Sequence, residues 1–112
     1  MKEKEHNTSK IVSYPLKFNK KQKLFLPVGA LPLSVSLVKD KLVLNVIEVI
    51  GEKEKEEFRI DINSSGEITT YRPGSTFVGT VNVAWDSKAY ILHVFYSHSE
   101  DNTLNEQESL RA

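Results

Sequence analysis

The sequence predicts an all-β protein, a small antiparallel sandwich or a partly open barrel of about seven or eight short strands. Apolar and polar residues alternate over several short segments, which is the period of a strand with one buried face. Clusters of Gly, Pro, Asn, Asp and Ser separate these segments at the spacing expected of such a fold. β-branched residues concentrate in one long apolar segment, which also favours strands.

The first half of the chain contains four of the expected strands. Two short ones are expected at residues 10–15 and 22–26, and the second ends at a Pro-Val-Gly sequence. In residues 33–37 apolar side chains alternate with serines, as in a half-buried strand. Residues 42–50 are apolar on both faces, which is typical of a central or sandwiched strand.

The second half continues the same pattern. The charged residues 51–57 are expected to form a solvated hairpin loop, and residues 58–62 alternate again. A short strand is expected at residues 68–71, before a Pro-Gly turn. Residues 77–85 and 90–96 form the clearest predicted hairpin, because both alternate and only a short turn separates them.

Three local features have specific structural explanations. Lys39-Asp40 and Asp86-Ser87 are expected to be two-residue turns between strands. Gly79 lies in mid-strand, where glycine weakens a sheet unless a bulge, another backbone or a ligand requires the space. Trp85 and Tyr90 flank the second turn and are expected to form a cross-strand aromatic pair, which becomes an interface candidate if it is exposed.

The chain of 112 residues is expected to hold one β domain, at residues 10–97. Residues 1–9 are polar and are predicted to form a disordered tail. Residues 98–112 carry four acidic side chains and one basic, and are predicted to form an acidic flexible tail. Within it, the spacing of Thr103 and Glu106 fits a capping box for a short helix.

Composition excludes several classes of function. Fifteen basic residues balance fifteen acidic ones, so we expect neither general nucleic-acid binding nor a polybasic membrane binder. Without cysteine there is no disulfide, thiolate metal site or cysteine nucleophile, and the three histidines have no metal-ligand spacing. We therefore expect no metal and no cofactor. The absence of a secretory signal or a long apolar stretch predicts a cytoplasmic protein with no membrane association.

The best candidates for ligand binding are Tyr71 and Arg72, an aromatic and a two-pronged donor beside a rigid turn. They are suited to stacking on a nucleotide and contacting its phosphate, although Arg72 is equally suited to covering a strand end. Arg59 is a second candidate for anion contact. The lysines at positions 17, 20, 21 and 23 are interpreted as a solvated surface.

His93 is the one histidine within an expected strand, and it completes the candidate ligand site together with Thr80. It is either a ligand contact or general base, or a hydrogen-bonded structural histidine, and the second interpretation is favoured. A catalytic histidine needs a nucleophile within hydrogen-bond reach, and no Gly-x-Ser-x-Gly sequence accompanies it. We therefore expect no enzyme, while an enzyme centred on His93 stays the third alternative.

Several short motifs in a fixed order resemble a known family. They are Tyr14-Pro15-Leu16, Leu26-Pro27-Val28-Gly29-Ala30, Leu33-Ser34-Val35, Gly79-Thr80 and His93-Val94-Phe95. Over residues 10–97 the chain resembles a family of short phage and prophage proteins classed as a domain of unknown function. The resemblance implies a compact β domain of phage origin and no particular activity.

Three functions are compatible with these observations. The favoured one is a non-enzymatic phage-type accessory protein that binds a host protein or sequesters a small anionic, nucleotide-like ligand in the cytoplasm of a bacterial host. The alternative is a structural or assembly component of a phage particle, and the third is the enzyme. A homo-oligomer is expected in the first two cases, because a small sheet protein exposes edges that pairing can cover.

Overall fold

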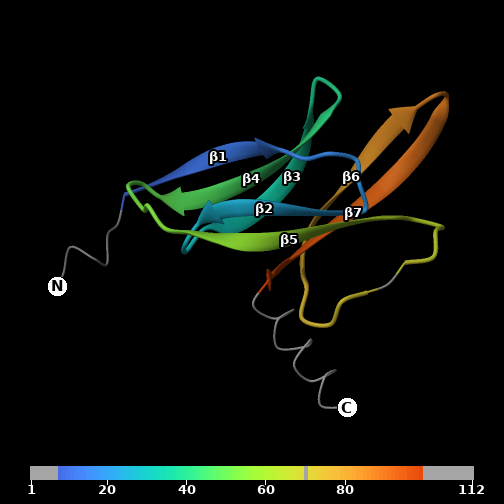
Figure 1. Ribbon diagram of the computed structural model, residues 1–112. Helices are drawn as coiled ribbons and strands as arrows, with labels where there is room; N and C mark the ends of the chain where they lie inside the picture. Colours follow the sequence, from blue (N-terminus) through green and yellow to red (C-terminus); the bar gives the residue numbers. More distant parts are fainter. Residues whose placement is uncertain (1–7, 70, 100–112) are drawn as a thin grey trace, which may run out of the picture.

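Seven strands form two antiparallel sheets in the computed structural model of the chain (Figure 1). The structure describes residues 8–69 and 71–99. In chain order the strands are β1 (Ser9–Pro15), β2 (Lys21–Pro27), β3 (Leu31–Val38), β4 (Lys41–Val49), β5 (Lys55–Ser64), β6 (Thr76–Trp85) and β7 (Lys88–His98). Strands β1-β4-β3 form one sheet and β2-β5-β7-β6 the other. The predicted all-β fold is confirmed, as two sheets rather than a closed barrel.

The expected two-residue turns join β3 to β4 and β6 to β7. Lys39 and Asp40 have φ values of 51° and 67°, and Asp86 and Ser87 have φ values of 51° and 64°. Positive φ at both central residues is the geometry whose twist matches that of an antiparallel hairpin. Both turns are thus confirmed at the positions that the sequence indicates.

Two predicted elements of the second half are wrong. Residues 51–57 do not form a hairpin loop, because β4 already pairs with β1 and β3 and the chain must cross to the other sheet. The segment also ends earlier than expected, since β5 begins at Lys55. Ile68, Thr69 and Tyr71 lie outside any strand, in the connection between β5 and β6.

That connection, residues 65–75, is a crossover. Both β5 and β6 pair antiparallel with β7, so they run parallel to each other on either side of it. Ser64 at the end of β5 is level with Leu92, whereas Thr76 at the start of β6 is level with Tyr96. The chain must therefore return along β7 before β6 can begin, as every parallel pair in one sheet requires.

The core lies between the sheets and receives side chains from both. Alternate residues of each strand point inward, so the register of pairing decides which side chains are buried. The largest fully buried side chains are Phe58, Leu26, Leu42, Leu44, Ile60, Val46 and Val94.

The two sheets approach each other most closely where β3 passes β6. Residue 78 of β6 is a bulge between Phe77 and Gly79. A Cβ at Gly79 would lie 3.2 Å from Cγ2 of Val35 on β3. Two of the explanations considered for a glycine in mid-strand therefore apply to Gly79, a bulge and the close approach of another strand.

One polar pair is built into the sheet of β1, β4 and β3. The Tyr14 hydroxyl donates a hydrogen bond to the Glu48 carboxylate, which is buried. Burial, and then the hydrogen bond and charge of Glu48, raise the pKa of Tyr14 to about 12. The phenol therefore remains protonated in the folded chain at pH values where an unfolded tyrosine ionises.

The contact at Gly79 predicts a measurable coupling. Gly79→Ala should lower the free energy of unfolding by about 1 kcal/mol, because the added methyl group crowds Val35. In a Val35→Ala background the same change should be tolerated, giving a coupling energy of about 1 kcal/mol in a denaturation cycle. Equal effects of Gly79→Ala in the two backgrounds would contradict this account.

The raised pKa of Tyr14 predicts a loss of stability at alkaline pH. Because the folded state holds this proton more tightly than the unfolded state, its contribution is complete below pH 10 and is lost as the pH rises toward about 12. Tyr14→Phe should be less stable than the wild type by about 1–3 kcal/mol at pH 8. The difference should shrink between pH 10 and 12 in urea titrations, and a constant difference would argue against the Tyr14–Glu48 bond.

Candidate functional site

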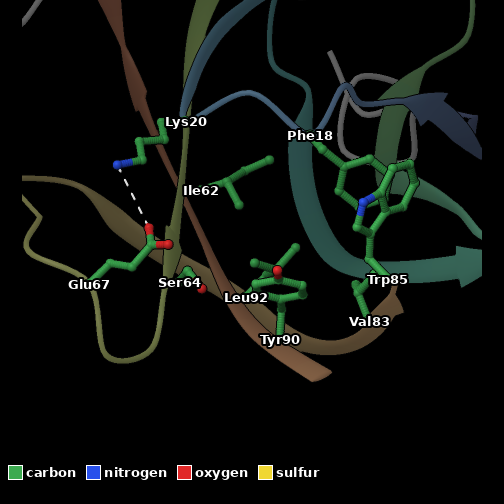
Figure 2. A pocket seen from close by; sticks show the side chains of 9 residues that line it. All are labelled: Phe18, Lys20, Ile62, Ser64, Glu67, Val83, Trp85, Tyr90 and Leu92. Atoms are coloured by element: carbon green, nitrogen blue, oxygen red, sulfur yellow. Dashed lines mark ion pairs between the residues drawn. The ribbon is translucent and has the colours of Figure 1, made fainter. Parts of the chain in front are cut away.

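A cavity of about 350 Å³ opens at one end of the sandwich (Figure 2). The β1–β2 connection, the end of β5 and the β6–β7 hairpin surround it. Its lining residues are Phe18, Lys20, Ile62, Ser64, Glu67, Val83, Trp85, Tyr90 and Leu92. Most of these side chains are apolar, and three of them are aromatic.

The cavity exists because the β6–β7 hairpin is longer than the sheet that should cover it. Val81, Val83 and Trp85 share one face of β6, the face that points into the core. The exposed fraction along this face rises from 9% at Val81 to 67% at Trp85. Figure 1 shows the hairpin of β6 and β7 extending away from the other strands. The inward face of its tip is therefore apolar but uncovered.

Phe18 reaches the cavity from the β1–β2 connection, which is held at both ends. Leu16 is buried in the core. The Gln22 side chain accepts a hydrogen bond from the Lys17 backbone N–H at 2.9 Å and donates one to the Lys17 carbonyl at 2.7 Å. These contacts fix the backbone around Phe18, whose side chain is 49% exposed.

The polar groups of the cavity lie at its rim. Lys20 Nζ and Glu67 Oε1 are 3.7 Å apart, and both side chains are at least half exposed. In Figure 2 this ion pair lies on one side of the cavity and Phe18 and Trp85 lie on the other. Because the two charges offset each other and the floor is apolar, the cavity is suited to an uncharged apolar group.

Trp85 and Tyr90, which were expected to form a cross-strand aromatic pair, are not directly opposite each other. In the register of the hairpin, Trp85 is opposite Lys88 and Tyr90 is opposite Val83. The two aromatic residues are instead diagonal neighbours on the same face of the hairpin. The sequence made this pair an interface candidate if it is exposed, and Trp85 is exposed. Phe18 was missed, since nothing near it in the sequence shows that it meets a distant hairpin.

All five candidate residues of the sequence lie in a different place, on the outer side of the four-stranded sheet. Arg59, Thr80 and His93 point outward from β5, β6 and β7. Tyr71 and Arg72 belong to the crossover, which packs on this outer face. The structure thus brings the five residues to one surface, but separates them from the apolar cavity.

Arg72 and Tyr71 hold the crossover against the sheet. Arg72 Nε lies 3.6 Å from Asp61 Oδ2, and both side chains are largely buried. Lys21 Nζ lies 3.4 Å from the other carboxylate oxygen of Asp61. The Tyr71 ring packs edge-on against Phe95, with 6.0 Å between ring centroids. This geometry is closer to the structural role considered for Arg72 than to ligand contact, but Arg72 lies against Asp61 within β5 rather than over a strand end.

Both ring nitrogens of His93 form hydrogen bonds with hydroxyl groups. Nε2 lies 2.7 Å from Ser65 Oγ and Nδ1 lies 2.9 Å from Thr80 Oγ1. Ser65 also donates its backbone N–H to the Ile91 carbonyl, so the histidine joins the start of the crossover to β6 and β7. A Ser–His contact of this length is one part of a nucleophilic site, but a hydroxyl occupies the orienting position where such sites usually have a carboxylate.

Among residues 8–69 and 71–99, no group of three or more His, Asp and Glu side chains is placed to hold a metal ion. Within the same residues there is no helix of the length and apolarity needed to cross a membrane. The helix considered at Thr103 to Glu106 and most of both expected tails lie outside the described residues.

The ion pair of Arg72 predicts a structural effect of its removal. Arg72→Ala should lower the free energy of unfolding by about 1–3 kcal/mol, because it removes a cation from the buried Asp61 carboxylate. Adding Asp61→Asn should recover part of the loss. Lys20→Ala, which breaks an exposed pair, should change stability by less than about 0.5 kcal/mol in the same urea titrations. An Arg72→Ala variant as stable as the wild type would show that the pair does not anchor the crossover.

Comparisons with known proteins gave no relative. No protein-family model, no curated protein and no solved structure matches the chain.

Proposed function

We propose that this protein is a non-enzymatic binding protein whose apolar cavity receives an apolar side chain of a partner protein. The observation that carries the proposal is the aromatic group around an open cavity of about 350 Å³, in which Phe18 and Trp85 are exposed and Tyr90 is partly buried. Aromatic residues are enriched where proteins bind one another, and a pocket for a buried anchor side chain is typical of such sites.

The charges favour an apolar partner over an anionic small ligand. Three of the lysines near the cavity and along β2 are paired with carboxylates: Lys20 with Glu67, Lys21 with Asp61, and Lys23 with Glu57. The hydrogen bond from Lys23 holds the pKa of Glu57 below its usual value. A phosphate group would have to compete with these carboxylates, and with Asp61 for Arg72. The nucleotide-like ligand therefore has less support than a protein partner.

The proposed cellular setting of this function, a bacterial cytoplasm, rests on the sequence alone. The resemblance to short phage and prophage proteins suggests a partner from a bacterial host, met in the cytoplasm. A small accessory protein of this kind needs no active site, and one anchored interface is sufficient for it to bind a host protein.

Trp85 makes the proposal directly testable, because it is the one tryptophan of the chain and lines the cavity. Peptides selected from a random displayed library against the immobilised protein should share an aromatic or leucine anchor. Their binding should shift the Trp85 emission to shorter wavelength, because an apolar side chain displaces water from the indole. Tyr90→Ala should weaken binding at least tenfold.

The control is Phe25→Ala, which removes an aromatic residue that is more exposed than Tyr90 and does not line the cavity. It should leave peptide affinity unchanged. Selected peptides that bind without a change in Trp85 emission, or that bind Tyr90→Ala as well as the wild type, would contradict the proposal. An emission shift produced by ATP, and none by peptides, would favour the small anionic ligand instead.

A further inference from the structure

The outer face of the three-stranded sheet is almost free of charge. Pairing and alternation place thirteen side chains on it: Ser9, Ile11, Ser13, Pro15, Leu31, Ser34, Ser36, Val38, Lys41, Val43, Asn45, Ile47 and Val49. Lys41, at the start of the central strand β4, is the single charged residue among them, whereas charged residues make up 27% of the chain. Depletion of charge distinguishes the core of a protein interface from ordinary surface.

This face is also apolar and uncovered in the single chain. Ile11 is 62% exposed, and Leu31 and Val38 are about half exposed. Strand β4 carries Val43, Ile47 and Val49 outward although its opposite face is fully buried. A strand that is apolar on both faces usually lies between two layers. Here the described chain provides one layer, and the second must come from outside it.

The polar side chains in the middle of the face are already satisfied by one another. Ser13 Oγ donates to Asn45 Oδ1 at 2.7 Å. Asn45 Nδ2 donates to Ser34 Oγ at 3.1 Å and to Ser36 Oγ at 3.0 Å. Because this row spans all three strands and uses its own hydrogen bonds, covering it with another apolar layer leaves few polar groups without partners.

The order of the apolar and polar rows indicates that a second copy of the chain covers this face. The polar row of Ser13, Asn45 and Ser34 is central. The row on one side of it consists of Ile11, Ile47 and Leu31, and the row on the other side consists of Pro15, Val43 and Ser36. A two-fold axis through the middle of such a face places apolar rows on apolar rows and polar on polar. An uncharged face also meets no repulsion from its own copy. We propose that this face is the interface of a homodimer, formed independently of the aromatic cavity.

The size of the face indicates a weak dimer. Strands about 4.8 Å apart and residues spaced by about 3.3 Å give the face dimensions of roughly 15 Å by 25 Å. Because the side chains make each face uneven, two copies together bury on the order of 1,000 Å². This area is near the lower limit for specific interfaces. We expect monomer and dimer to exchange at micromolar concentrations.

Sedimentation of the full chain between 5 and 500 μM tests the proposal, and the sedimentation coefficient should rise toward that of a dimer. Ile11→Glu should raise the dissociation constant at least 100-fold, because two-fold symmetry buries two new carboxylates. The matched control is Ile91→Glu, which changes an isoleucine of comparable exposure on the other sheet and should leave the constant unchanged. A chain that is monomeric over the whole range would overturn the proposal, as would a dimer insensitive to Ile11→Glu or broken by Ile91→Glu.

A second variant distinguishes pairing of faces from pairing of strand edges. Asn45 is on β4, which has a strand on each side and no free edge. Asn45→Asp keeps the shape of the side chain but brings two negative charges together across the axis, so it should weaken a face-to-face dimer at least tenfold. An edge-to-edge dimer would be unaffected, and that result would overturn the proposal. Unchanged circular dichroism and Trp85 emission show that the variants fold.

Discussion

The parallel placement of β5 and β6 on either side of β7 is the constraint on which the two outer faces of the molecule depend. It forces residues 65–75 to return along the sheet before β6 begins. The crossover carries Tyr71 onto Phe95 and Arg72 onto Asp61, and thereby covers part of one outer face. The opposite sheet consists of β1, β4 and β3, and no comparable connection covers it among the residues that the structure describes. One sheet is therefore covered by its own chain, while the other presents an apolar, nearly uncharged surface.

The cavity does not result from the crossover but from a mismatch in strand length between the two sheets. The strands of the β6–β7 hairpin contain 10 and 11 residues, whereas those of the three-stranded sheet contain 7 to 9. Alternation continues to the end of the hairpin, so Val83 and Trp85 point inward beyond the last opposing strand of the described chain. Phe18 covers only part of the gap. The aromatic cavity is thus the uncovered end of the core rather than a separate structure added to it.

Several charges on β2, β5 and the crossover form local pairs. Asp61 lies between Lys21 and Arg72, and Glu57 pairs with Lys23 along the neighbouring part of the sheet. These pairs hold β2 and the crossover to β5, and they reduce the attraction for an anionic ligand. Recognition by shape and apolar contact is therefore the chemistry that this molecule offers most clearly, both at the cavity and at the outer face.

The sequence by itself determined most of the strands and the tight turns, because both are local properties. Alternation predicted the hairpin of residues 77–85 and 90–96, and Lys39-Asp40 and Asp86-Ser87 turn where expected. Only the tertiary structure decided which strands are neighbours. That choice made residues 51–57 a passage between sheets and residues 68–71 part of a crossover. It also placed Phe18 beside the end of a distant hairpin and Ser65 on His93. Such contacts depend on pairing between segments far apart in the chain, which no local pattern of residues specifies.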